Sequence, residues 1–159
     1  MTATTGNAPL LETETEIDAP PETVWALITD PRALGGLSDQ VLRTHVVGTE
    51  PVGLGTRTVN INRRGPLVWP TRAKVVRFEP TTDYAFRIKD NATIWSFALA
   101  PTATGGTHVT HRREAPTGTT KVSKMLQAKV LGGIEEFDHE MVLGMGVTLQ
   151  RLKALLETS

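Results

Sequence analysis

The strongest periodic pattern in this sequence lies near its C-terminal end, over residues 134–157. Apolar side chains recur there at steps of three or four, the period of an α-helix with one buried face. The stripe consists of Ile134, Phe137, Met141, Met145, Thr148, Leu152 and Leu155, widened by Val142, Leu149 and Leu156. At about 1.5 Å per residue the predicted helix is roughly 36 Å long. It therefore needs an equally wide apolar surface to lie on.

Gly144 interrupts this stripe three residues after Met141, and Gly146 follows closely. A glycine inside a helix costs roughly 0.5–1 kcal/mol relative to alanine. Two interpretations of Gly144 follow. Either the helix backbone packs closely on its neighbour at this point, or the missing side chain leaves space between the helix and the surface that it covers.

Upstream of the helix, short alternating segments separated by turn residues predict an antiparallel sheet. The first runs from Leu11 to Ile17 and alternates with acidic residues. Glycine, proline and asparagine mark the breaks between the later segments, as in hairpins. These strands are predicted near residues 41–48, 55–63, 67–78, 82–89, 92–100 and 106–115. Short connections favour a meander, and the C-terminal helix is the large cover available for its apolar face.

Two short helical segments are predicted between the first strand and the meander. Residues 22–29 follow a pair of prolines, and a second short helix or turn starts at Asp30-Pro31 and stops at Gly35-Gly36. Residues 116–131 are either a short helix or a loop over one end of the sheet. We expect residues 1–9 to be a disordered tail and residues 10–158 to form a single ligand-binding domain.

Composition and charge narrow the classes of function. Seventeen basic and seventeen acidic residues give a formal net charge of zero, unlike a typical nucleic-acid binder. The absence of cysteine excludes disulfides, thiol nucleophiles and thiolate metal sites. There is neither a signal-peptide pattern nor an apolar run of membrane length, so we expect a cytoplasmic protein without a transmembrane segment or nucleic-acid partner. The basic residues of the strands are expected mostly on a solvated outer face; they are Arg57, Arg63, Arg64, Arg72, Lys74, Arg77, Arg87 and Lys89.

Four stretches carry a resemblance to a known family: TETEIDAPPETVWALITDP, GLGTRTVNI, WSFALAPTATGGTHVTHRREA and GMGVTLQRLKALLE. With the order of the elements, they resemble the START and Bet v 1-like (SRPBCC) superfamily, in its polyketide cyclase/dehydrase branch, over residues 10–157. The resemblance implies an α+β helix-grip fold, in which a curved antiparallel sheet of about seven strands wraps a long C-terminal helix. Two short helices follow the first strand. It also implies a cavity for an apolar small molecule. Because members include binding proteins, lipid carriers, aromatase/cyclases and co-chaperone-like domains, it does not fix an activity.

The alternation of side chains in the last strand makes two polar residues candidates for a cavity. If Val109 points inward, His111 and Arg113 do so as well, because alternate residues share a face. They are then plausible polar groups of a cavity, since burial requires partners for them. The alternative is that both lie in solvent at the end of the sheet. Tyr84 shares a side with Phe86, and its hydroxyl either orients a ligand carbonyl or is satisfied within the core.

No motif in the sequence indicates a metal or a cofactor. His108 and His111 are three residues apart on a strand and therefore face opposite sides. The pairs Gly53-x-Gly55 and Gly144-x-Gly146 lack the third glycine and the strand-to-helix context of a nucleotide-binding loop. We expect neither a metal nor a cofactor.

The leading hypothesis is binding of a hydrophobic or aromatic small molecule, lipid- or polyketide-like, between the sheet and the C-terminal helix. A first alternative is a cyclase, aromatase or dehydratase, in which His111 or Tyr84 exchanges protons and Arg113 steadies an enolate. Without cysteine, the histidines are the side chains expected to titrate near neutral pH. A second alternative is a protein-interaction module with a filled core, and a homodimer is kept open. The predicted ligand contacts are Trp69, Tyr84, Phe86, Trp95, Phe97, His111, Arg113, Met141, Gly144 and Met145.

Overall fold

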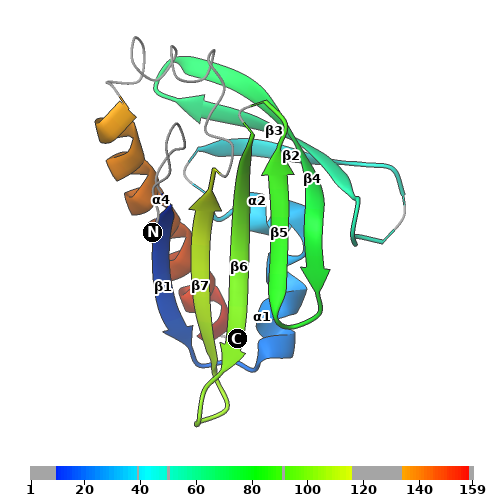
Figure 1. Cartoon of the computed structure of the whole chain (residues 1–159), viewed down its shortest axis with the longest axis vertical. Coiled ribbons are helices and arrows are strands. Elements are labelled where there is room, and N and C mark those ends of the chain that lie inside the picture. The colour runs from blue at the N-terminus through cyan, green and yellow to red at the C-terminus, as the bar shows by residue number, and fades with distance from the viewer. Residues whose placement is uncertain (1–9, 39, 50, 91, 116–133, 158–159) are drawn as a thin grey trace.

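A computed structural model describes residues 10–38, 40–49, 51–90, 92–115 and 134–157 of the chain (Figure 1). In this part of the chain, seven antiparallel strands form one sheet in the order β1-β7-β6-β5-β4-β3-β2. Strands β2 to β7 form the predicted meander, and the first strand of the chain pairs with the last. Their bounds are β1 Leu11–Ile17, β2 Val41–Val47, β3 Arg57–Arg64, β4 Leu67–Glu79, β5 Asp83–Ile88, β6 Thr93–Pro101 and β7 Thr107–Glu114.

The described helices lie on one face of the sheet (Figure 1). Helices α1 (Pro21–Ile28) and α2 (Pro31–Gly35) lead from β1 at one edge to β2 at the other, and α4 (Ile134–Glu157) lies against β1. This is the predicted helix-grip fold, and the strand bounds differ from the expected ones by at most two residues. The tail 1–9 and the segment 116–131 lie outside the described residues, so the expectations for them stay predictions.

The hydrophobic core gathers at one end of the molecule, where the second half of α4 meets α1 and the sheet. Leu149 and Leu152 of α4 are 1% and 0% exposed, and they share this core with Val24 and Ile28 of α1. Leu155, expected in the buried stripe, is 49% exposed. Because 3.6 residues make a turn, a stripe at fixed steps drifts around a long helix, and Leu156 packs on the core instead. The side chains of Ile134 and Phe137 lie outside the described residues.

Hydrogen bonds attach the second half of α4 to two neighbouring segments of the chain. Lys153 Nζ donates to the backbone oxygen of Glu16 at 2.7 Å, and the backbone N–H of Asp18 donates to Glu157 Oε2 at 2.8 Å. Arg151 Nη1 donates to the backbone oxygen of Leu37 at 3.3 Å. These contacts hold the helix to the end of β1 and to the segment after α2.

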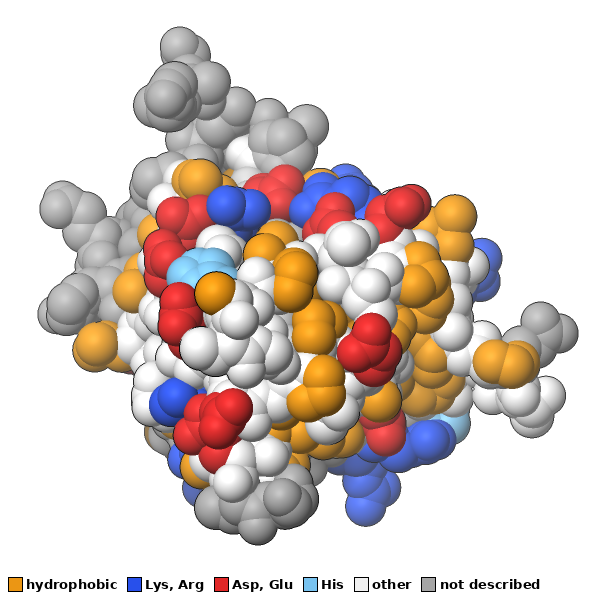
Figure 2. Space-filling model, turned by 90° about the horizontal axis from the view of Figure 1, so that it is seen from below, with side chains coloured by type: hydrophobic (Ala, Val, Ile, Leu, Met, Phe, Trp, Pro, Cys, Tyr) orange, Lys and Arg blue, Asp and Glu red, His pale blue; other side chains and the backbone are white. Residues whose placement is uncertain are grey.

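Basic side chains on the outer face of the sheet are matched by carboxylates on neighbouring strands. Arg77 contacts Asp83 at 2.8 Å and Glu114 at 2.9 Å, which raises the pKa of its guanidinium through the bond to Glu114. Arg112 of β7 forms an ion pair with Glu12 of β1. Figure 2, which views the molecule from below, shows apolar side chains gathered in the middle of that end with acidic and basic side chains mostly around them. None of the described helices is long and apolar enough to cross a bilayer.

Gly106 marks a point where two backbones come too close for a side chain. A Cβ added there would lie 2.6 Å from the backbone oxygen of Ile17. That oxygen belongs to the end of β1, which is paired with β7, so it cannot move without disturbing the sheet. Glycine at this position allows β1 and the start of β7 to come together.

We expect Gly106→Ala to lower the free energy of unfolding by about 1–3 kcal/mol, as overpacking does. Gly53→Ala is the matched control, because no atom of the described residues lies within 4 Å of a Cβ added there. It should stay within about 0.5 kcal/mol of wild type. Urea denaturation of the three proteins tests this, and an equal loss in both variants would contradict the packing argument.

Candidate functional site

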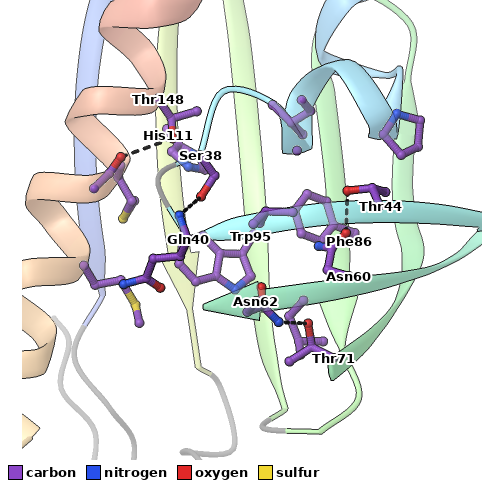
Figure 3. Close-up of a pocket in the computed structure, with 18 of the residues that line it drawn as sticks. Ser38, Gln40, Thr44, Asn60, Asn62, Thr71, Phe86, Trp95, His111 and Thr148 are labelled. Atoms are coloured by element: carbon purple, nitrogen blue, oxygen red, sulfur yellow. Dashed lines mark hydrogen bonds between the residues drawn. The ribbon is translucent and has the colours of Figure 1, made fainter. Parts of the chain in front are cut away.

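The concave side of the sheet encloses a cavity of about 490 Å³. Its walls are the sheet from β2 to β7, the first half of α4, α2 and the segment that follows α2 (Figure 3). The part of the interior that the described residues surround is therefore not filled, which disfavours the alternative of a protein-interaction module with a filled core. The cavity and the hydrophobic core divide the concave side between them, because the core occupies the end where α4 is packed down.

Helix α4 covers the cavity with its first half. Met141 and Met145 line the cavity, and Gly144 lies between them on the same side. No atom of the described residues lies within 4 Å of a Cβ added at Gly144. Of the two interpretations of this glycine, close backbone packing is therefore wrong, and the missing side chain leaves open space.

Aromatic side chains form the apolar wall on the sheet. Trp69, Phe86, Trp95 and Phe97 line the cavity from three successive strands, β4, β5 and β6. Tyr84 also lines it and is 2% exposed. Its ring belongs to a cluster that continues into the core, with edge contacts to Trp25 at 6.1 Å and Phe78 at 6.2 Å and a tilted contact to Phe86 at 6.0 Å. This cluster fixes the boundary between core and cavity.

Tyr84 is held in its protonated form. Burial raises the pKa of Tyr84 to about 12, and the negative charge of Asp30 adds to the shift. A phenol of this kind can donate or accept a hydrogen bond at neutral pH, but it does not readily give up its proton.

His111 lies on the wall of the cavity and is 4% exposed. Its ring stacks on Phe97, with centroids 4.0 Å apart and 8° between the planes, and Nδ1 lies 2.9 Å from the backbone oxygen of Ser96. Burial lowers the pKa of His111 to about 4, although the bond to Ser96 opposes the shift. The expectation that this histidine titrates near neutral pH is wrong. Because a carbonyl oxygen can only accept, Nδ1 of the neutral ring carries the proton and Nε2 remains an acceptor.

Arg113 has the predicted orientation but not the predicted place. It is 1% exposed, so the alternative of a solvated position at the end of the sheet is wrong. It is nevertheless absent from the described residues that line the cavity, and its Nη1 lies 3.8 Å from Met141 Sδ. The parity of a strand fixes the face of a side chain but not which neighbours cover it. Arg113 therefore lies behind a cavity residue.

Nine of the ten residues predicted to contact a ligand line this one cavity, and Arg113 is the exception. Their contact with a ligand stays a prediction. His108 lies on the other face of β7, where Nε2 contacts Glu14 Oε1 at 2.8 Å, so it cannot join His111. No group of three metal-binding side chains occurs among the described residues.

The polar part of the cavity wall was not predicted from the sequence. Asn60, Asn62 and Thr71 line the cavity from β3 and β4, while Val59 and Ile61 lie on the other face of β3. Apolar residues normally face the interior, so the pattern TVNIN favours the opposite orientation of this strand. Further polar side chains in the lining are Ser38, Gln40, Thr44, Thr58, Glu140 and Thr148.

Arg64 is an exception to the solvated basic series predicted for the strands. Its Nη2 lies 2.6 Å from both carboxylate oxygens of Glu140, and its Nε lies 3.1 Å from Oε1. Its parity on β3 is that of Asn60 and Asn62, so it points to the concave side and reaches α4. This ion pair connects β3 to the first half of α4 beside the cavity.

A family model described as polyketide cyclase/dehydrase and lipid transport matches residues 9–157. No curated protein is detectably similar in sequence.

Solved structures with the same fold include three that cover nearly the whole chain. A polyketide-cyclase-like protein of Corynebacterium glutamicum is 23% identical over 93% of this chain and 91% of its own, with a TM-score of 0.62. A protein of Nitrosomonas europaea is 17% identical over 94% of each chain, with a TM-score of 0.67. The Aha1 dimer of Colwellia psychrerythraea is 19% identical over 93% of this chain and 96% of its own, with a TM-score of 0.61. The TM-scores establish a shared fold, and at identities this low the fold is all that the comparison establishes.

The buried His111 should make stability depend on pH. Its folded pKa of about 4 lies below the ordinary value of 6.5, so in that interval the unfolded chain binds a proton that the folded chain does not. The free energy of unfolding should therefore fall as pH decreases from about 6.5 to about 4, by up to roughly 1.4 kcal/mol per unit. Urea unfolding across this range should show a shallower decline in His111→Gln. If NMR of the folded protein showed the His111 ring titrating with a midpoint near pH 6.5, the lowered pKa of His111 would be contradicted.

Proposed function

This chain belongs to the polyketide cyclase/dehydrase and lipid transport family, and from that premise we propose that it binds a hydrophobic or aromatic small molecule. The binding site is the cavity between the sheet and α4. The observation that carries the proposal is an interior of about 490 Å³ with aromatic and methionine walls and a few polar groups. This volume and this mixture are typical of small-molecule sites. The cytoplasmic location expected from the sequence stays a prediction, and the homodimer stays an open possibility.

Features of α4 support a site that accommodates a ligand rather than a packing defect. Gly144 leaves open the space that a side chain would take, and Met141 and Met145 flank it. Methionine side chains are flexible and polarisable, so they adapt to ligands of irregular shape. The helix loses propensity at Gly144, and the gain is volume inside the fold.

A cyclase, aromatase or dehydratase that uses the same cavity is the alternative function. His111 and Tyr84 lie in the cavity wall, but their pKa values of about 4 and about 12 are both displaced away from neutrality. A general acid or base works best with a pKa near the working pH. Arg113, the proposed support for an enolate, lies outside the described lining. These observations favour binding over catalysis.

Filling the cavity from α4 tests the proposal. In Gly144→Leu the new side chain should enter open space, so the melting temperature should hold while the affinity for Nile red, an uncharged apolar dye, falls roughly tenfold or more. Gly146→Leu is the matched control: it has the same open surroundings but is not a lining residue, so it should keep both properties. The measurements are thermal melting and dye fluorescence on all three proteins.

Two results would contradict the proposal. A sharp drop in melting temperature limited to Gly144→Leu would mean that the helix has no free volume beneath it, since overpacking costs about 1–3 kcal/mol. Dye binding that is unchanged in Gly144→Leu would place the dye site elsewhere.

A further inference from the structure

Four polar residues form a row on the cavity wall, on the part of the sheet made by β2, β3 and β4. We call Thr44, Asn60, Asn62 and Thr71 the polar row (Figure 3). Thr44 Oγ1 donates to Asn60 Oδ1 at 2.7 Å, and Asn62 Nδ2 donates to Thr71 Oγ1 at 2.9 Å. The row is therefore held in place by its own hydrogen bonds before any ligand arrives.

The orientation of the Asn62 amide is forced by its neighbours. Its Nδ2 also donates to the backbone oxygen of Trp69 at 3.2 Å, and that oxygen can only accept. The nitrogen must face Trp69 and Thr71, and Figure 3 shows the amide oxygen turned away from Thr71. Oδ1 has no hydrogen-bond partner among the described residues, although Asn62 is 9% exposed and lines the cavity. An amide oxygen in this state can accept a hydrogen bond from a donor on a ligand or a solvent molecule in the cavity.

Asn60 presents the complementary group. Because its Oδ1 accepts from Thr44, its Nδ2 is left as a donor. Asn60 and Asn62 are alternate residues of β3, so they stand on one face at a spacing of roughly 7 Å. Together they present one donor and one acceptor to the cavity from the same face of β3.

The charges around the cavity disfavour an anionic ligand. Among the described lining residues, Glu140 is the one with a formal charge at neutral pH, and Arg64 contacts both of its oxygens. His111 is neutral there. A ligand carboxylate that entered this cavity would lose its hydration, and no cationic side chain of the described lining would pair with it. Its transfer from water would therefore cost free energy.

We propose that the polar row selects an uncharged ring compound with two oxygen groups on one edge. This inference rests on the proposed function, the binding of a small molecule in the cavity. A hydroxyl of the ligand donates to Asn62 Oδ1, and its second oxygen accepts from Asn60 Nδ2. The apolar body of the ligand lies against the aromatic wall, including Trp69, which pairs with Asn62 across β3 and β4. Fatty acids and other anionic amphiphiles are poor ligands.

Three probes with one ring system test this selection: 2,7-dihydroxynaphthalene, naphthalene and naphthalene-2-carboxylate. The diol carries both hydroxyls on the same long edge, naphthalene lacks them, and the carboxylate is charged. Titration calorimetry on the wild-type chain should rank the diol first, roughly tenfold tighter than naphthalene, and the carboxylate last.

Asn62→Leu should abolish the preference. The affinity for the diol should fall roughly tenfold, and naphthalene should bind at least as well as before, which also shows that the cavity is intact. Asn62 also hydrogen-bonds to Trp69 and Thr71, so its replacement could disturb the wall itself. Asn60→Leu is therefore the second variant, because among the described residues the Asn60 side chain hydrogen-bonds to Thr44 alone. It should lower diol affinity roughly fivefold. Thermal melting of both variants confirms folding.

The outcomes separate this inference from the proposed function. If neither Nile red nor any probe binds the wild type, both fail. If Nile red binds but the diol is not preferred over naphthalene, or the carboxylate binds best, the inference alone is overturned. Equal losses of diol and naphthalene affinity in both variants also overturn it, because the asparagines would then shape the cavity without selecting the ligand.

Discussion

The attachment of the second half of α4 to the sheet is the constraint on which the rest of the structure depends. Leu149 and Leu152 are buried in the core, and Lys153 and Glu157 bond to the backbone at the end of β1. The first half of α4 lines the cavity together with residues of β2, β3 and β4, and the ion pair between Arg64 and Glu140 connects it to β3. The cavity is the space between these elements.

The same geometry explains the chemistry of the cavity. Side chains near the core, such as Tyr84 and His111, lose water and are held in their neutral forms, as their pKa values of about 12 and about 4 show. Farther along the sheet, Asn60 and Asn62 hydrogen-bond to Thr44 and Thr71 and line the cavity with polar groups. An apolar, uncharged wall beside a row of amides and hydroxyls suits a binding site that distinguishes ligands by shape and hydrogen bonding.

The sequence predicted the elements well because each carried its own period. The alternation around Tyr84 and Phe86 placed both on the concave side, and the stripe from Met141 to Leu152 defined α4. The sequence could not predict features that depend on which side chains pack against a residue and on how deeply the residue is buried. Parity placed Arg113 on the correct face but not behind Met141, and no pattern reports the burial that lowers the pKa of His111. The cavity-facing side of β3 was missed for another reason: this strand turns asparagines toward the interior, against the usual rule, because a cavity lies there.

The central claim is that this cavity holds a small molecule, and native mass spectrometry of freshly purified protein tests it most directly. The account predicts a species heavier than the 17.3 kDa chain by one uncharged organic molecule, which collisional activation releases. In Gly144→Leu that species should be lost or strongly depleted, while Gly146→Leu should retain it. An adduct carried equally by both variants, or an apo protein that also takes up none of the uncharged ring compounds offered to it, would contradict the claim.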